Sequence, residues 1–501
     1  MCGASLGFIG ASVVNVALPT FQLELGADAT DIQWIVSGYN LAIASLLLGA
    51  GAFSDRFGHR KTFCCGLLCY TGASIVCGAA TNPDLMITAR VVQGFAAALL
   101  VPSSLGLVNS AYPAASRGRA VGLWSSFSAV GAGLGPLIGG LMIEYASWRY
   151  LFWMNVPIAL AAWWLLATSH AVKDTAHRDH PFDWTGAAFS VATLGVLTFA
   201  AIETSVLGIA HPLILAGFML AVAGAWLFIR TQSRSPAPLL PLGMFRSRDF
   251  SAVNLATFLA YCTIGGGFYV MMLTWIQIQG YSPLAAGAIT VPFMLFTGGF
   301  AHAIGHLVAR IGPRIPLTAG MLLLAGGFLS WTLPAIGTSF WIGYLPGVLA
   351  TALGIALIVG PVTTVVMGTV ELKQSGTASG VNSAVARSAI LLSVAVLGAI
   401  HYGVFERSAT AAFDAMRLDP ELAAYLREEL INMAAIEIPA GVEPATRRAI
   451  GVVIDTAFLR AARVVMLIAG VLALAGAYVV YRWVGSVAPP GRRRDHGERI
   501  T

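Results

Sequence analysis

Long apolar runs separated by short polar connections dominate the chain. Fourteen of these runs reach the length of about 20 residues that a membrane-spanning helix needs. They are placed at about residues 3–25, 34–54, 62–81, 84–108, 119–144, 149–169, 184–204, 211–230, 251–279, 284–309, 315–334, 339–368, 377–403 and 461–484. The segment 404–460 instead mixes apolar and charged residues at helical spacing, and we expect one or two short amphipathic helices there, on the outer surface. The pattern predicts an all-α polytopic membrane protein with fourteen transmembrane helices.

The most highly charged interruption of this pattern is the stretch Gly51–Lys61, which reads GAFSDRFGHRK. Because so many charges cannot lie in hydrocarbon, it should form a short polar turn between two membrane helices. A degenerate copy of the stretch repeats Gly51, Arg56, Gly58 and Arg60 at a constant offset of 254 residues. A repeat of this kind indicates two homologous halves.

The repeated turn predicts a division of the whole chain. Residues 1–169 form an N-terminal half of six helices, and residues 251–484 form a C-terminal half of six helices that includes the outer loop 404–460. Residues 170–250 supply two inserted transmembrane helices with cytoplasmic linkers. Residues 485–501 are basic and polar, and we expect them to form a cytoplasmic tail.

Composition and charge agree with a membrane protein. Of the 501 residues, 57% are hydrophobic and 10% are charged, whereas a soluble chain carries about 25% charged residues. The net charge of +6 could suggest a nucleic-acid partner, but its distribution points to membrane orientation. With a cytoplasmic N-terminus, nineteen Lys and Arg residues lie on inner connections, while the short outer connections hold only Arg149. We therefore expect a multi-pass protein of the cell (inner or plasma) membrane with both termini cytoplasmic.

The cysteines do not indicate a cofactor or a disulfide framework. Four of the six, Cys64, Cys65, Cys69 and Cys77, fall in one apolar segment with no His or acidic residue nearby. We interpret them as small core residues, and we expect no metal or other cofactor.

Polar residues inside the apolar runs indicate a transport pathway. Each is costly in lipid and should face a cavity or a partner. They are Asn15, Asn40, Arg90, Gln93, Asn254, Gln277, Asn382 and Arg387. Two related halves of this kind are typical of transporters, whose substrate site lies near the middle of the membrane where the halves meet. No Ser/His/Asp set, metal cluster or phosphate loop stands at usable spacing, which argues against an enzyme.

Several motifs resemble those of the major facilitator superfamily. The stretch Gly51–Lys61 is similar to the superfamily signature between helices 2 and 3, with Phe53 for the usual Leu and His59 for the usual Arg or Lys. Ala89–Gly94 resembles the R-x-x-Q-G of helix 4, and Gly131–Gly140 resembles the antiporter signature G-x-x-x-G-P-x-x-G-G. The Ser12–Pro19 sequence SVVNVALP and the Trp148, Arg149, Phe152, Asn155, Pro157 pattern are similar to those of the fourteen-helix drug:proton antiporters.

The first group of candidate residues is expected to control opening and closing. Asp55 could pair with Arg60, or meet the positive N-terminal end of a helix from the other half, and so hold the cytoplasmic side closed. A solvated loop charge is the alternative. The glycines of helix 5 would allow another helix to approach closely, while Pro136 would bend the segment. The gating candidates are Gly51, Asp55, Arg56, Gly58, Arg60, Gly131, Gly135, Pro136, Gly139 and Gly140.

A second group is expected to line a substrate cavity. Arg90 could bind an anionic substrate group or lower the pKa of a nearby acid; a structural Arg bonded to helix-end carbonyls is the alternative. Aromatic side chains, including Trp34, Tyr261 and Trp275, could supply stacking or cation–π surface. The candidates for coupling and the substrate cavity are Asn15, Tyr39, Asn40, Arg90, Gln93, Trp124, Asn382 and Arg387.

One departure from the resemblance affects the expected energy source. Where the subfamily usually has an aspartate in helix 1, two residues before the Ser or Thr, this chain has Gly10. His302 or His306, one turn apart, could substitute as protonation sites because histidine titrates near neutral pH. Packing histidines are the alternative reading.

The resemblance and the residues together predict a secondary active exporter that works by alternating access. We expect proton-coupled efflux of drug-like or amphipathic small molecules, with lipid bilayer and protons as further partners and a functional monomer. The alternative left open by Gly10 is an exporter or facilitator of one specific metabolite without proton coupling.

Overall fold

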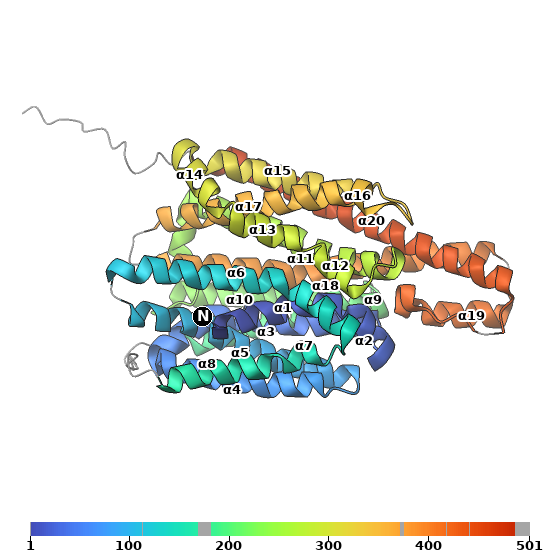
Figure 1. Ribbon diagram of the computed structural model, residues 1–501, viewed down its shortest axis with the longest axis horizontal. Helices are drawn as coiled ribbons and strands as arrows, with labels where there is room; N and C mark the ends of the chain where they lie inside the picture. Colours follow the sequence, from blue (N-terminus) through green and yellow to red (C-terminus); the bar gives the residue numbers. More distant parts are fainter. Residues whose placement is uncertain are drawn as a thin grey trace, which may run out of the picture.

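The structure is a computed structural model that describes residues 2–112, 114–168, 182–370, 375–416, 418–439 and 441–485. These residues form a bundle whose long helices run side by side along the long axis of the molecule, with no strand among them (Figure 1). Most of the predicted linker at 170–183 and all but the first residue of the predicted tail 485–501 lie outside the described residues.

The helices follow one another in simple order. The first part of the chain contains α1 (Cys2–Ser12), the 3₁₀ helix η1 (Val13–Val16), α2 (Leu18–Leu25), α3 (Ala29–Phe57), α4 (His59–Gly78), α5 (Pro83–Ala111), α6 (Ala114–Tyr145), α7 (Tyr150–Trp153) and α8 (Asn155–Thr168). The next pair is α9 (Trp184–Leu207) and α10 (Pro212–Arg234). Helix α9 packs against α10, α3 and α18, so the pair lies beside both parts of the bundle.

The last part of the chain completes the bundle. It contains η2 (Leu242–Arg246), α11 (Arg248–Leu273), the π-helical turn η3 (Thr274–Ile278), α12 (Pro283–Ala288), α13 (Val291–Gly299), α14 (Ala301–Ile311), α15 (Arg314–Ser330), α16 (Phe340–Gly343), α17 (Leu345–Gly368), α18 (Ser375–Ala415), α19 (Pro420–Glu428), the 3₁₀ helix η5 (Glu429–Ala435) and α20 (Pro444–Trp483). Two of the principal contacts with the first part of the chain are those of α18 with α3 and of α12 with α6.

Local sequence explains where these helices begin. Asp28 and Asp31 form a capping box at the start of α3, each side chain accepting a hydrogen bond from the other's backbone N–H. At α5, the Asn82 side chain accepts from the Leu85 amide at 2.9 Å, and Pro83 occupies the first turn, where its missing N–H has no cost.

The two turns predicted to be related do share their backbone geometry. Gly58 ends α3 with φ 96°, and Gly312 ends α14 with φ 78°, a region that side chains other than glycine rarely adopt. Each glycine amide closes the last helical turn, onto Ser54 and Val308 respectively. We call the end of the bundle with these two turns the basic end. The opposite end, which carries α19, is the loop end (Figure 1).

Length and composition support many membrane crossings. Among the described residues, nine helices are long and apolar enough to cross a membrane, or up to eleven if two sharply bent helix pairs each count as one span. The remaining predicted spans include the broken stretch α1–η1–α2 and the 17-residue α15. The count of fourteen therefore stays a prediction.

The helices around the predicted outer loop are longer than the sequence suggested. Helix α18 has 41 residues and continues to Ala415, and α20 has 40 residues and begins at Pro444. At 1.5 Å per residue each measures about 60 Å, twice the hydrocarbon thickness. Instead of the predicted 404–460, only about residues 416–443 lie between them, and among the described residues of this segment α19 and η5 supply two short helices.

The 3₁₀ helix η5 connects the two parts of the bundle at the loop end. It packs against α2 and α3 on one side and against α18 and α20 on the other. Leu430 and Met433 carry this contact, because their side chains are buried in the same core as those helices. Met433 has a positive φ of 54°, which is uncommon for a residue other than glycine.

Candidate functional site

A buried polar network surrounds Arg90 on α5. Its Nε donates to the carbonyl oxygen of Ile35 at 3.2 Å, and its Nη1 donates to Gln93 Oε1 at 2.6 Å. Gln93 Nε2 in turn donates to Ser74 Oγ at 2.7 Å, and Asn155 Nδ2 reaches the same oxygen at 3.4 Å. The network joins α3, α4, α5 and α8, and Arg90 and Gln93 are almost completely buried.

Tyr39 on α3 packs against Arg90, at the side of this network. The Arg90 guanidinium carbon lies 4.1 Å from the centre of the Tyr39 ring, which is cation–π distance. The Tyr39 hydroxyl donates to the carbonyl oxygen of Gly7 at 2.6 Å. Gly94 allows the close approach of the two helices, because a Cβ there would lie 2.4 Å from the Tyr39 carbonyl oxygen. This packing explains the glycine that follows Gln93 in the helix 4 motif.

Gly10 faces the hydroxyl of Tyr70. That hydroxyl donates to the carbonyl oxygen of Leu6 at 2.7 Å. A Cβ on Gly10 would lie 2.2 Å from the Tyr70 hydroxyl oxygen. The space in which a longer residue 10 would stand is therefore filled by a tyrosine of α4. The absence of an acid at position 10 of the first helix therefore goes together with the presence of the Tyr70 hydroxyl in that space.

A double-mutant cycle should reveal this coupling. We expect Gly10→Ala to destabilise the fold by about 1–3 kcal/mol, because the added carbon overlaps the Tyr70 hydroxyl. In Gly10→Ala/Tyr70→Phe the nearest ring carbon would be 3.5 Å away, an ordinary contact, so the double variant should lose less than the sum of the single variants. Thermal unfolding in detergent measures the three losses, and strictly additive losses would contradict the arrangement.

A smaller polar cluster lies in the last part of the chain. Asn382 on α18 donates from Nδ2 to Asn254 Oδ1 at 3.1 Å and to Thr257 Oγ1 at 2.9 Å, both on α11. Arg387, also on α18, is partly exposed.

The remaining cavity candidates have diverse surroundings. Asn15 lies in η1, where the first apolar segment is interrupted, and is partly exposed. Asn40 donates to the carbonyl oxygen of Val36 on its own helix at 3.0 Å, and Trp124 Nε1 donates to Ser104 Oγ at 2.9 Å. His306 is exposed on α14. The side chain of His302 lies outside the described residues.

At the basic end, Asp55 pairs with His59. The His59 Nε2 atom lies 3.4 Å from Asp55 Oδ1, and His59 Nδ1 is 3.1 Å from Ser54 Oγ. Arg60, the predicted partner, donates to the carbonyl oxygen of Leu166 at 3.2 Å. Gly58 separates α3, which carries Asp55, from α4, which begins at His59, so the contact between Asp55 and His59 is made across the turn. The pairing of Asp55 with Arg60 stays a prediction.

The other glycine and arginine of the turn are accounted for locally. Arg56 stacks over the ring of Phe57 at 5.7 Å. A Cβ on Gly51 would meet nothing within 4 Å, whereas Gly106 of α5 packs directly on the His59 ring, at 2.3 Å from Nδ1 to the ideal Cβ. The chain thus has His59 where the family motif has Arg or Lys, and Gly106 leaves the space that the His59 ring occupies.

The glycine stripe of α6 contacts two different partners. Cβ atoms on Gly135 and Gly139 would meet Ser12 and Val13 of the broken first segment. A Cβ on Gly140 would lie 2.4 Å from the carbonyl oxygen of Pro283 on α12, and one on Gly287 would lie 2.3 Å from that of Pro136. Gly131 is buried on the same helix. Backbone therefore meets backbone where α6 crosses α12.

Several members of these clusters were not among the predicted site residues. Ser74 and Tyr70 were not singled out, and Asn155 was named only within a motif, although Ser74 and Asn155 are fully buried polar side chains in apolar helices. The rule that selected Gln93, a polar residue within an apolar run, could have found them. Among the described residues, no group of three or more His, Cys, Asp or Glu side chains is arranged to hold a metal ion.

Comparison with known proteins places this architecture in a family. A sequence profile described as the Major Facilitator Superfamily matches residues 1–394. The multidrug resistance protein Stp of Mycobacterium tuberculosis is 32% identical over 79% of this chain and 74% of its own length. The tetracenomycin C resistance and export protein of Streptomyces glaucescens is also 32% identical, over 95% of this chain and 89% of its own.

Solved structures show the same fold at low sequence identity. A bacterial homologue of the human lysosomal transporter Spinster has a TM-score of 0.60 and 16% identity, covering 96% of this chain and 94% of that chain. The xylose transporter XylE of Escherichia coli has a TM-score of 0.57 and 15% identity, covering 98% and 96%.

Proposed function

The chain belongs to the major facilitator superfamily and is a multi-pass membrane transporter, and on this basis we propose that it exports drug-like, amphipathic small molecules. The names of the relatives support this substrate class, since they include a multidrug resistance protein, a tetracenomycin C export protein and methylenomycin A resistance proteins. The protein acts as a monomer in the cell membrane, with both termini and the basic end in the cytoplasm.

Alternating access of two halves is the mechanism we propose, with α9 and α10 as an insertion between them. The observation that carries it is the backbone contact of α6 with α12, which supports a state closed at the loop end. Helix η5 adds to that closure because it packs against both parts of the bundle. At the basic end, α14 packs against α13, α15 and α17 of its own part. This asymmetry supports a state open to the cytoplasm.

The substrate site we propose lies around Tyr39 and Arg90 of one half and includes Arg387 and Asn382 of the other. Tyr39 is buried and Arg90 covers one face of its ring in this structure, so the ring would offer an aromatic face to a ligand only after the two halves move. A site of this kind suits amphipathic molecules, because stacking on an aromatic face tolerates variation in the ligand. Asn15, Asn40, Gln93 and Trp124 contribute to its walls.

Proton antiport is the energy source we propose for export, in agreement with the antiporter motif of α6. His302 and His306 are the candidate protonation sites. The second candidate function is export of one specific metabolite without proton coupling. The packing of Tyr70 against Gly10 favours this alternative, because no acid can stand at that position in this arrangement.

A transport assay tests the proposal directly. The full chain is expressed in a pump-deficient host and screened for growth protection and efflux against a broad set of amphipathic antibiotics and dyes. We expect protection against several unrelated compounds, and we expect an uncoupler to abolish it. Protection against a single compound that is unaffected by the uncoupler would favour the second function. Transport of no compound in the set would contradict drug export.

Asp55→Asn is expected to reduce transport by about tenfold while leaving membrane insertion unchanged. The Asp55 side chain is 59% exposed, and a surface pair contributes about 1 kcal/mol or less to stability, so the fold should tolerate the change. The loss should arise in the state closed at the basic end, where the carboxylate would meet a helix N-terminus. Efflux per inserted molecule is the measurement, with Asp84→Asn at the loop end as control. Near-normal efflux by Asp55→Asn would remove the gating role.

A further inference from the structure

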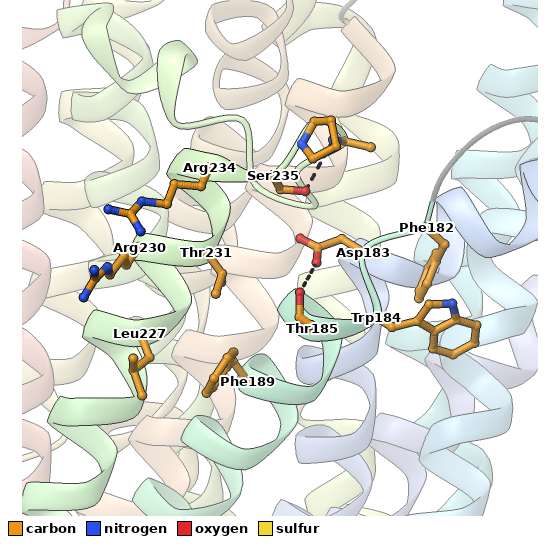
Figure 2. A pocket seen from close by; sticks show the side chains of 12 residues that line it. Phe182, Asp183, Trp184, Thr185, Phe189, Leu227, Arg230, Thr231, Arg234 and Ser235 are labelled. Atoms are coloured by element: carbon orange, nitrogen blue, oxygen red, sulfur yellow. Dashed lines mark hydrogen bonds between the residues drawn. The ribbon is translucent and has the colours of Figure 1, made fainter.

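A cavity of about 640 Å³ opens between α9 and α10 at the basic end of the bundle. Figure 2 shows that its walls come from the start of α9 and from the last turns of α10. Its lining includes the apolar side chains of Phe189 on α9 and Leu227 on α10, and the basic side chains of Arg230 and Arg234 on α10. The cavity is thus amphipathic, and it lies apart from the polar network around Arg90.

The cavity rests on a rigid hydrogen-bonded frame. Asp183 caps α9: its Oδ1 accepts from the Gly186 amide and from Thr185 Oγ1, both at 2.8 Å. Its Oδ2 accepts from Gln232 Nε2 of α10 at 2.7 Å, and Gln232 Oε1 accepts from the Leu240 amide at 2.9 Å. Burial acts to raise the pKa of Asp183, but the hydrogen bonds outweigh it and hold the pKa below its ordinary value. The carboxylate therefore joins the two helices and is already satisfied.

The two arginines are positioned for a ligand. They stand one turn apart on α10, and in Figure 2 both guanidinium groups lie on the same side of the helix. Both side chains are exposed, and among the described residues neither forms an ion pair. Arg230 stacks over the Trp226 ring at 5.1 Å, which orients its guanidinium without satisfying its N–H donors.

The surroundings of the cavity are those of a lipid-facing surface. Of the nine apolar helices, α10 is the least buried in the protein, and it therefore offers the most surface to the bilayer. Trp184 and Trp226 are more than half exposed near the same end, as expected for tryptophans at a membrane–water interface. Leu227, about one turn before Arg230 on α10, adds exposed apolar surface beside the two arginines.

We propose that this cavity binds the headgroup of an anionic phospholipid. The two guanidinium groups would contact the phosphate, because planar N–H donors match phosphate oxygens in pairs. An acyl chain would follow Leu227 and Phe189 along the groove between α9 and α10. Basic pockets between membrane helices are suited to such headgroups, whereas a positive charge that serves only for membrane orientation needs no adjoining groove. The proposal requires membrane embedding but not drug export, so either can fail without the other.

Lipid titration of the purified full chain in detergent tests the site. After delipidation, phosphatidylglycerol, phosphatidylcholine and inorganic phosphate are added separately, and bound lipid is measured by native mass spectrometry alongside the melting temperature. We expect phosphatidylglycerol to bind and to raise the melting temperature, and we expect the other two to do neither. Equal binding of phosphatidylcholine, or an equal effect of inorganic phosphate alone, would overturn the proposal.

Matched variants separate the site from bulk positive charge. Arg230→Ala/Arg234→Ala should weaken phosphatidylglycerol binding by about 25-fold, a loss of about fivefold for each arginine. Arg246→Ala/Arg248→Ala removes the same charge from exposed positions at the same end and should change binding less than twofold. Arg230→Lys/Arg234→Lys, which keeps the charge and guards against a folding defect, should retain part of the affinity. Equal losses in the two alanine pairs would contradict the site.

Discussion

The double variant Gly140→Ala/Gly287→Ala is expected to separate α6 from α12 and to reduce transport by about tenfold or more. Each added methyl group would lie less than 2.5 Å from a backbone carbonyl oxygen of the opposite helix. Backbone cannot move aside as the end of a flexible side chain can, so the two helices must part. Overpacking of about 1–3 kcal/mol at each position is enough to make the state closed at the loop end a minor one.

Spin labels can follow this separation directly. Tyr145 on α6 and Ser282, just before α12, are both exposed and can be replaced by labelled cysteines in a chain without its native cysteines. We expect the distance distribution between the labels to lengthen in the double variant. Gly195→Ala is the control, because a Cβ there meets nothing within 4 Å. An unchanged distance together with full efflux would show that this contact does not hold the loop end closed.

The glycines at these contacts show which parts of the fold could be predicted from the sequence. The polar turn and its distant copy were recognisable because charge and glycine stand out in an apolar chain, and Gly58 and Gly312 do adopt the same positive-φ geometry. The glycines of α6 could be predicted to pack closely, but their partner α12 could not. Which helix faces a glycine stripe depends on the arrangement of the whole bundle.

The loop end was harder to predict for a physical reason. Charged residues such as Glu406 and Arg407 suggested that the helix ends near 403, yet α18 continues to Ala415 because a helix outside the bilayer can carry charge on its exposed face. Leu430 and Met433 were read as part of a surface loop, but their side chains are buried between the two parts of the bundle. Hydrophobicity alone does not reveal such a long-range contact.

In the candidate site, too, single residues could be predicted from the sequence but their pairings could not. The buried polar residues were identified one by one because each is costly in an apolar helix. Their partners were not: that His59 lies beside Asp55 across the turn was not predicted. Gly10 was noted as a missing acid, and only the packing shows that Tyr70 occupies its place. Pairing depends on helix register and on neighbouring helices, which single positions do not encode.

Of two substitutions at position 90, Arg90→Ala is expected to reduce efflux more than Arg90→Lys, by about tenfold or more. The truncation leaves Gln93 Oε1 without its donor at a buried site, which costs about 1–3 kcal/mol, and removes the cation that stacks on Tyr39. Arg90→Lys keeps the charge but not the planar fork that reaches both Ile35 and Gln93. It should therefore retain part of the transport.

Efflux per folded molecule separates a transport role from a structural one. A structural arginine would lower the melting temperature and the yield of Arg90→Ala, while the molecules that fold would transport normally. A residue of the substrate site would instead lower efflux per folded molecule, and Arg90→Lys would shift the preference among substrates. Arg407→Ala, an exposed arginine on α18, is the matched control. Equal and full efflux by both Arg90 variants would make Arg90 an anchor of α5 against α3 and remove it from the substrate site.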